Sequence, residues 1–504
     1  MEPEPPQTKH IIMLPFMAQG HLIPFLELAH HILNHNPTFT ITIVNTPLNI
    51  HYLRSATTNH PSPPSQLHLK PLPFNSSDHH LPPNSENTDG LPLTQIIKLF
   101  HASAALEQPF RKFIHDVVVL EKRNNVCIVS DIFMGWANDV AKSFNIFNYS
   151  FSTGGAYGTA AYCSIWLNLP HRSLSGGTHD EFWVPGFPES SRFTITQLHQ
   201  FLRAADGKDE WSRFFQVQIS LSLKSNGWLC NTVEEIEPLG LEVLRNYIKL
   251  PVWCIGPLIP FKMLKKNLGS DTGLDTGVIG PRSGKQPGIQ PEQCIEWLDS
   301  RATGSVLYIS FGSQNTIGES QMMELAKGLE ESKRPFIWVI RPPIGFDLKG
   351  DFRPEWLPNG FNDRIGKQGL VVHNWAPQLE ILCHRATGAF LSHCGWNSVM
   401  ESLSQGVPII GWPMAAEQGY NAKMLVEEMG VCEVLTRGVH SRITKEEVSR
   451  VINVVLDKSE GGKGEDMREK ASKLGDLIRA SVEDNKGSSY RAMDEFLTSA
   501  ISGF

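Results

Sequence analysis

Residues 375–418 read WAPQLEILCHRATGAFLSHCGWNSVMESLSQGVPIIGWPMAAEQ, and their pattern is the most informative in the chain. Its two apolar runs, at 388–391 and 407–410, are short and flanked by small or turn-forming residues, which is typical of buried parallel strands. The pattern predicts a strand end, a helix, a strand, a second helix, a third strand and a loop. Such alternation indicates an α/β protein with a parallel sheet.

The start of the second helix is suited to binding an anion. Gly395 allows a tight turn after the first strand, and Asn397 and Ser398 are expected to cap free backbone N–H groups with their side-chain oxygens. A helix N-terminus carries about half a positive charge and exposed donors, so it can hold a diphosphate. Glu401 follows on the same helix face, where a carboxylate can bind ribose hydroxyls.

Other polar and aromatic groups converge on the same edge of the predicted sheet. Trp375 offers a flat face on which a base can stack, an interaction worth roughly 1–3 kcal/mol. Glu417 and Gln418 follow the third strand, at the edge where open α/β sheets bind ligands. Each residue alone is equally well explained as part of an ordinary βαβ unit. Together they favour a nucleotide site.

The stretch resembles the signature motif of plant-type UDP-glycosyltransferases that modify small secondary metabolites, over a long, ungapped segment. The resemblance implies a UDP-sugar donor site with distinct tasks for its residues. Trp375 would stack on uracil with Ala376 beside it, Gln378 would contact the nucleoside, and Glu401 would hold the ribose. The diphosphate would be bound by His393, Asn397 and Ser398, with Ser313 near the phosphates, Trp396 near the sugar, and Glu417 and Gln418 on the sugar hydroxyls.

The last two residues of the motif bear on the donor sugar. In the family a final Gln, here Gln418, tends to accompany glucose, whereas His tends to accompany galactose. The position of Glu417 more often holds Asp, so the carboxylate here stands one methylene further from the backbone. Glucose is therefore the expected sugar, and the fine selectivity of the site among sugars is left open.

Composition limits the classes of protein to consider. With 504 residues, 41% hydrophobic and 19% charged, the chain is typical of a globular protein of two or three domains. A net charge of −7 gives no attraction to nucleic acid or anionic membranes. We see no apolar run of the ~18 residues that a spanning helix needs, and no signal-peptide pattern. Eight scattered cysteines suggest reduced thiols, and a cytoplasmic location is expected.

The N-terminal half opens as a Rossmann-like unit. An apolar strand at 9–16, a turn, a helical pattern at 22–33 and a strand at 39–44 follow one another. His21 is thereby expected at the carboxyl end of the first strand, where it is either a solvated loop residue or part of a ligand site.

The resemblance extends to this half. Residues 17–21 are similar to the segment that carries the family's catalytic base, which implies that role for His21. Asp131, after an apolar strand at 126–129, matches the carboxylate that orients the base; it could also cap a helix expected at 132–144. Thr153 matches a position that contacts donor sugar.

The resemblance covers nearly the whole chain and implies the GT-B fold: an α/β protein with two Rossmann-like domains facing across a cleft. We expect an acceptor-binding domain at 1–260, a linker at 261–291 that is rich in Gly, Ser, Asp and Lys, and a donor-binding domain at 292–480. A final helical segment at 481–504 is expected to pack back on the first domain. The aromatic-rich residues 166–215 are a reasonable place for acceptor-binding elements.

The implied reaction is an inverting transfer of a sugar from a UDP-sugar to a hydroxyl of a lipophilic acceptor, either a flavonoid or other phenolic or a terpenoid. His21 would act as general base and Asp131 would orient it. No metal and no cofactor is expected, since the UDP-sugar is a co-substrate and we find no Asp-x-Asp triplet. The acceptor's identity, O- versus C-attachment and the oligomeric state are left open.

Other classes are less well supported. The pairs Cys383-His384 and His393-Cys394 match no zinc spacing. A dehydrogenase would need G-x-G-x-x-G after the first strand, and a P-loop enzyme G-x-x-x-x-G-K-[ST]; both motifs are missing. A non-catalytic UDP-sugar or metabolite-binding protein remains the alternative, although the intact pair His21 and Asp131 favours an enzyme.

Overall fold

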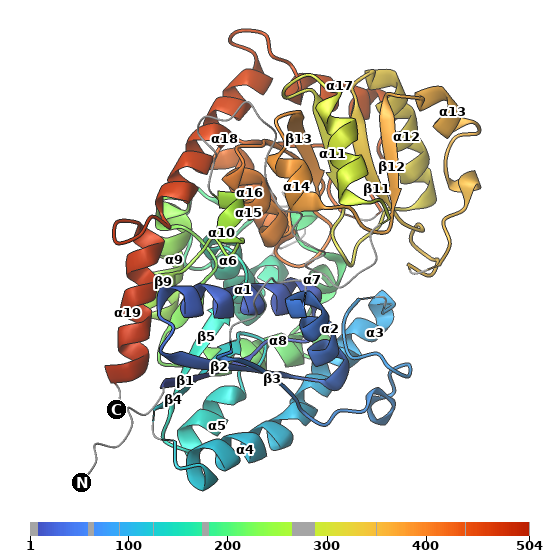
Figure 1. The fold of residues 1–504 in the computed structure, drawn as a ribbon. Coiled ribbons are helices and arrows are strands. Elements are labelled where there is room, and N and C mark those ends of the chain that lie inside the picture. Colours follow the sequence, from blue (N-terminus) through green and yellow to red (C-terminus); the bar gives the residue numbers. More distant parts are fainter. Residues whose placement is uncertain are drawn as a thin grey trace.

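A computed structural model describes residues 9–58, 65–89, 91–123, 125–173, 181–264, 288–348, 350–438 and 440–502. The two halves of the chain form two α/β domains, and Figure 1 shows the C-terminal one above the N-terminal one. Most of the expected linker at 261–291 lies outside the described residues. The predicted domain boundaries on either side of it stay a prediction.

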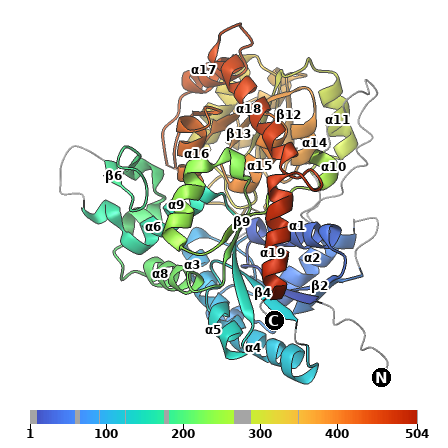
Figure 2. The same ribbon diagram turned by 90° about the vertical axis from the view of Figure 1, so that its left-hand side faces the viewer.

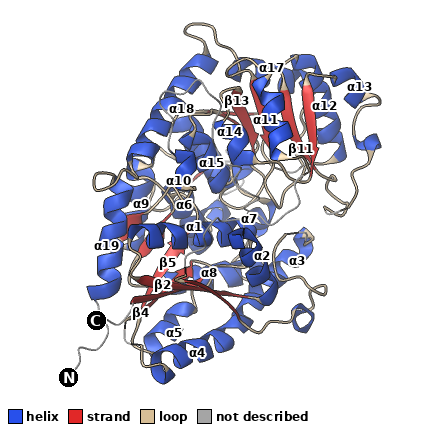
Figure 3. Ribbon diagram, in the orientation of Figure 1, coloured by secondary structure: helices blue, strands red, loops and turns tan. Residues whose placement is uncertain are grey.

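The N-terminal half forms a sheet of seven parallel strands in the order β3-β2-β1-β4-β5-β8-β9. Its strands are β1 (Lys9–Leu14), β2 (Phe39–Asn45), β3 (Leu67–Pro71), β4 (Val126–Asp131), β5 (Phe147–Ser152), β8 (Trp228–Cys230) and β9 (Val252–Cys254). A small antiparallel pair, β6 (Glu181–Trp183) and β7 (Arg192–Thr194), lies outside it. The central strand β1 is apolar from Ile11 to Leu14, because helices cover both faces of the sheet (Figure 3). The buried part of the strand also contains one polar residue, His10, whose Nε2 lies 2.8 Å from the Thr42 hydroxyl on β2.

The helices of this half are α1 (Gln19–His35), α2 (Pro47–Thr58), α3 (Leu93–Ala102), α4 (Glu107–His115), α5 (Ala137–Ser143), α6 (Ala156–Asn168), α7 (Gln200–Ala204), α8 (Glu210–Ser222), α9 (Pro238–Ile248) and α10 (Phe261–Leu264). The first helix begins at Gln19 rather than at residue 22, so His21 lies in its first turn and not in a loop.

The helix expected at 132–144 is shorter than predicted, because residues 132–136 form turns and α5 begins at Ala137. Asp131 Oδ1 accepts a hydrogen bond from the Phe133 N–H at 2.9 Å, and this interaction stabilises a turn. The alternative that Asp131 caps a helix is therefore wrong.

The C-terminal half forms a second sheet of six parallel strands in the order β12-β11-β10-β13-β14-β15. Its strands are β10 (Val306–Ser310), β11 (Phe336–Ile340), β12 (Gly369–His373), β13 (Thr387–Ser392), β14 (Ile409–Gly411) and β15 (Cys432–Val434). The helices are α11 (Pro291–Asp299), α12 (Glu319–Ser332), α13 (Phe361–Ile365), α14 (Gln378–Cys383), α15 (Trp396–Ser404), α16 (Gln418–Glu427), α17 (Lys445–Val455), α18 (Lys463–Ala480) and α19 (Ser488–Ser502). The strand and helix order predicted for residues 375–418 is present.

The last helix, α19, crosses from the second domain to the first (Figure 2). It packs on β9, and Phe496 contacts the rings of Tyr149 and Trp253. A hydrogen bond of 2.6 Å joins His35 on α1 to Asp494. Two Rossmann-like domains facing one another give the GT-B architecture that we expected. None of the described helices is long and apolar enough to cross a membrane.

Candidate active site

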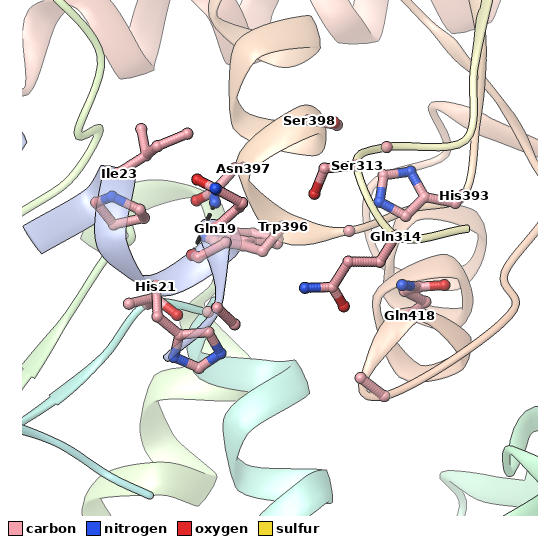
Figure 4. A pocket seen from close by; sticks show the side chains of 18 of the residues that line it. Gln19, His21, Ile23, Ser313, Gln314, His393, Trp396, Asn397, Ser398 and Gln418 are labelled. Atoms are coloured by element: carbon pink, nitrogen blue, oxygen red, sulfur yellow. Dashed lines mark hydrogen bonds between the residues drawn. The ribbon is translucent and has the colours of Figure 1, made fainter. Parts of the chain in front are cut away.

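A cavity of about 430 Å³ lies between the two domains, where the carboxyl ends of strands from both sheets meet. Every residue predicted for the site lines this cavity except Asp131, which lies behind His21. Figure 4 shows His21 at the α1 side of the cavity and Trp396, Asn397 and Ser398, which belong to α15, on the facing side. The cavity therefore brings the predicted base and the predicted donor motif together.

His21 and Asp131 form a buried pair. The Nδ1 atom of His21 lies 2.6 Å from Oδ2 of Asp131, whose side chain is 0% exposed, while the His21 side chain is 21% exposed. Because the carboxylate can only accept, Nδ1 carries a proton and the neutral ring keeps its lone pair on Nε2. This is the geometry of a general base with its orienting group.

The electrostatic surroundings of His21 raise its pKa above the ordinary value of 6.5. Burial alone would lower the pKa, since it penalises the imidazolium. The charge and hydrogen bond of Asp131, together with the charge of Glu417, outweigh that effect. His21 is thus suited to accepting a proton and holding it.

The N-terminus of α15 faces the cavity, but its capping differs from the prediction. Gly395 is the N-cap residue, and as a glycine it has no side chain with which to cap the helix. The expectation that Asn397 and Ser398 cap it is wrong, because both lie within the first turn. Asn397 instead donates to the Gly20 carbonyl at 3.1 Å, and Ser398 accepts from Gln378 at 2.9 Å. The N–H group of Trp396 is engaged by the Glu417 carboxylate. The other N–H groups of the first turn have no partner within the helix and can bind an anion.

Gln378 organises the nucleoside end of the predicted donor site. Its Nε2 atom donates to Ser398 Oγ at 2.9 Å and to Glu401 Oε2 at 2.7 Å, and its Oε1 accepts from the Tyr308 hydroxyl at 3.3 Å. Trp375, with the buried Ala376, lines the cavity next to this network. The carboxylate of Glu401 is thereby held in place before any ribose arrives.

His393 is a neutral imidazole held between two glycines. A Cβ atom at Gly312 would lie 2.6 Å from its Nε2, and one at Gly395 would lie 2.5 Å away. Burial, assisted by the charge of Arg341, lowers the pKa of His393 to about 4. Among the described residues its buried Nδ1 has no hydrogen-bond partner. His393 can therefore donate a hydrogen bond to an anion, but it does not bring a positive charge to it.

Glu417 and Gln418 lie at the start of α16. Gln418 Oε1 accepts hydrogen bonds of 2.9 Å from the N–H groups of both Met414 and Ala415, and so shapes the loop before the helix. Burial raises the pKa of Glu417, although its own N–H and the charge of His21 act in the opposite direction. Glu417 thus lies close enough to His21 for the two charges to interact.

Comparison with known proteins agrees with this geometry. A family model described as "Glycosyltransferase, N-terminal domain" matches residues 8–260, and one described as "UDP-glucoronosyl and UDP-glucosyl transferase" matches residues 276–461. UDP-glycosyltransferase 92A1 of Arabidopsis thaliana is 42% identical over 505 residues, which is 98% of each chain. The chain belongs to the UDP-glycosyltransferase family. It is an enzyme that transfers a sugar from a UDP-sugar.

Further similar proteins include a second relative and two solved structures. Crocetin glucosyltransferase 3 of Crocus sativus is 45% identical over 464 residues. The aligned part covers 90% of this UDP-glycosyltransferase and 92% of the relative. UGT73P12 of Glycyrrhiza uralensis, complexed with glycyrrhetinic acid 3-O-monoglucuronide, has a TM-score of 0.81 at 26% identity, covering 98% and 96% of the two chains. UGT71G1 of Medicago truncatula, complexed with UDP-glucose, has a TM-score of 0.76 at 25% identity, covering 98% of both.

Two site residues of this UDP-glycosyltransferase were missed by sequence reasoning. Arg341 donates to the carbonyl groups of Ser313 at 2.7 Å and Asn374 at 3.3 Å, and so joins two loops at the cavity. Asn231, which is 2% exposed, donates to the Thr153 carbonyl at 3.4 Å. Both residues directly follow strands, so the strand-end rule that singled out His21 also applied to them.

The wall of the cavity on the N-terminal side is aromatic. The stretch expected to supply acceptor-binding elements contributes His199, Phe201, Trp211 and Phe215. Phe215 contacts the ring of Phe133, which in turn lies 5.4 Å from the ring of His21. A lipophilic molecule in this space would therefore lie beside the base.

The UDP-glycosyltransferase shows no group of three or more His, Cys, Asp or Glu side chains that could hold a metal ion within the described part of the chain. That a metal and a cofactor are not needed stays a prediction.

Proposed function

We propose that this UDP-glycosyltransferase transfers glucose from UDP-glucose to a hydroxyl of a lipophilic small molecule, with inversion at the anomeric carbon. The observation that carries the proposal is the buried His21–Asp131 pair, which lines one side of the same cavity as the N-terminus of α15. One side can activate an acceptor hydroxyl, and the other can receive a diphosphate.

In the proposed reaction, Nε2 of His21 takes the proton of the acceptor hydroxyl as its oxygen bonds to the anomeric carbon. The bond between that carbon and the diphosphate oxygen breaks, and UDP leaves with its added negative charge. Asp131 stabilises the imidazolium, and general-base help of this kind is typically worth about 10²–10⁴-fold. The N–H groups at the start of α15, with Ser398 and His393, stabilise the leaving UDP.

The same proposal gives roles to five further donor-site residues. Trp375 and Gln378 bind the uridine, Glu401 binds the ribose, and Glu417 with Gln418 binds the sugar. Their support is the common cavity and the network that Gln378 makes with Ser398 and Glu401.

For the acceptor, the aromatic wall supports a lipophilic molecule. Relatives are named for crocetin in Crocus sativus, for a flavonoid in Fragaria ananassa and for scopoletin in Nicotiana tabacum. We propose an acceptor from this general class, a phenolic or an extended conjugated molecule. A cytoplasmic location belongs to the proposal as well, and it is supported by eight cysteines that are all free thiols.

The test is release of UDP from UDP-glucose against a panel of phenolic, conjugated and terpenoid acceptors. The chain should release UDP only when an acceptor is present, and His21→Ala should lose at least about 10²-fold in kcat. His35→Ala is the matched control, because His35 also contacts an Asp but lies on the far end of α1. Acceptor-dependent release that survives His21→Ala would exclude His21 as the base. Binding of UDP-glucose without release for any acceptor would favour the non-catalytic alternative.

A further inference from the structure

The carbonyl group of Gly20 lies beside the proposed base and lacks the usual helical partner. In a regular α-helix this carbonyl would accept a hydrogen bond from the N–H of the residue four positions on. That residue is Pro24, inside α1, and proline has no N–H. The carbonyl immediately before His21 therefore needs a donor from elsewhere.

Asn397 supplies that donor from the opposite domain. Its Nδ2 atom donates to the Gly20 carbonyl at 3.1 Å, and Figure 4 shows its side chain reaching towards the start of α1. Its Oδ1 atom accepts from Nδ2 of Asn231 at 3.4 Å. Because one end of the carboxamide must accept from Asn231, the other end is directed to Gly20.

Asn231 is itself held firmly, so it can fix the orientation of Asn397. Its Oδ1 atom accepts from the Leu258 N–H at 3.0 Å, and its carbonyl group accepts from the indole N–H of Trp396 at 2.5 Å. Two consecutive residues of α15, Trp396 and Asn397, thus dock on one buried residue of the first domain. The start of α15 and the start of α1 are held in one arrangement.

We propose that Asn397 is a positioning residue for the catalytic base. Its carboxamide, which comes from the donor-binding domain, replaces the hydrogen bond that Pro24 removes from α1. Asn397 thereby couples the N-terminus of α15, where the donor diphosphate binds, to the orientation of His21. The inference rests on the proposed role of His21 as base. This positioning role differs from direct binding of the diphosphate by the Asn397 side chain, because direct binding would affect the affinity for the donor and not the orientation of the base.

Pro24 offers a direct test by a double-mutant cycle. Pro24→Ala provides an N–H where the Gly20 carbonyl can accept it, so the bond from Asn397 should become dispensable. With saturating UDP-glucose and acceptor, Asn397→Ala should lower kcat by roughly two- to tenfold in the natural background, the range expected for one neutral hydrogen bond. In the Pro24→Ala background the same change should lower kcat by less than about twofold.

Ser398→Ala is the matched control, because Ser398 lies in the same turn and bonds to Gln378 within its own domain. It should change the KM for UDP-glucose equally in both backgrounds. An equal loss of kcat from Asn397→Ala in both backgrounds, or an effect on the KM for UDP-glucose alone, would overturn the inference. If His21→Ala retained full activity, both the base and the positioning role would be wrong. If His21→Ala were inactive and the cycle additive, only the positioning role would be wrong.

Discussion

Nδ1 of His21 and Oδ2 of Asp131 lie 2.6 Å apart although 110 residues separate them in the chain. β1 and β4 are neighbours in the first sheet, and the two side chains meet where these parallel strands end. The carboxylate is fully buried, and its second oxygen is bound by the Phe133 N–H. The pair is therefore rigid, and its chemistry can be tested by changing either member.

Asp131→Asn should lower kcat by about 10²- to 10⁴-fold, because the amide can stabilise the wrong tautomer and carries no charge for the imidazolium. The KM for UDP-glucose should change little. The measurement is steady-state UDP release, with urea unfolding of the variant to show that it is folded. Asp131→Glu, which keeps the charge, should retain more activity than Asp131→Asn. The reverse order would argue against the orienting role.

The pH dependence should reflect the raised pKa of His21. Only the neutral ring can accept a proton, so kcat/KM should fall towards low pH around a value above 6.5. Since the charge of Glu417 raises that pKa, Glu417→Gln should move the acid limb to lower pH. The control is Glu401→Gln, whose carboxylate is not among the groups that act on His21. A limb that moves to higher pH in Glu417→Gln would contradict the sign of the interaction.

The raised pKa of His21 also predicts how the stability of the fold depends on pH. A histidine whose folded pKa is raised above 6.5 stabilises the fold fully below that pH, and this contribution is lost as pH rises through the folded pKa. The free energy of unfolding in urea, measured between pH 6 and 9, should therefore decline less steeply in His21→Ala than in the natural chain. Identical slopes would show that the folded and unfolded pKa values of His21 are the same.

Gly395→Ala should weaken UDP binding through His393. The new Cβ atom would lie 2.5 Å from Nε2 of that ring, which is packed and cannot move freely. Overpacking of this kind costs about 1–3 kcal/mol of folding stability. The displaced imidazole should also bind UDP less tightly, which calorimetry can measure. Gly318→Ala, at the N-cap of α12, serves as control because its nearest contact is an ordinary 3.6 Å. Unchanged UDP binding in Gly395→Ala would mean that His393 does not need its present position.

His199→Phe should alter acceptor use and leave donor use unchanged. The Nε2 atom of His199 is buried with no hydrogen-bond partner among the described residues, and burial with the charge of Arg203 lowers the pKa of the ring to about 4. Replacing an unpartnered buried polar atom by carbon should stabilise the fold by about 1 kcal/mol. The KM for acceptors should shift while the KM for UDP-glucose stays the same. A shift in the KM for UDP-glucose would place His199 outside the acceptor side.

Sequence reasoning worked best where chemistry depends on local spacing. Residues 375–418 contain a strand, a helix start and a strand end in immediate succession, so the order of elements and the cavity-lining position of Trp375, Gln378 and Glu401 followed from the pattern. Helix starts were harder to predict. The absent side-chain caps at α15 and the turn after Asp131 depend on which hydrogen bonds the neighbouring elements offer.

The α/β class, the two Rossmann-like domains and the family could all be predicted from the sequence, because periodicity and motif spacing are properties of a continuous segment. The meeting of Gly20, Asn231 and Asn397 depends on tertiary packing, since they come from α1, the end of β8 and α15. A proline leaves one carbonyl without its helical donor, but nothing in the local sequence indicates which distant side chain will supply the replacement. That choice depends on how the two domains pack across the cleft.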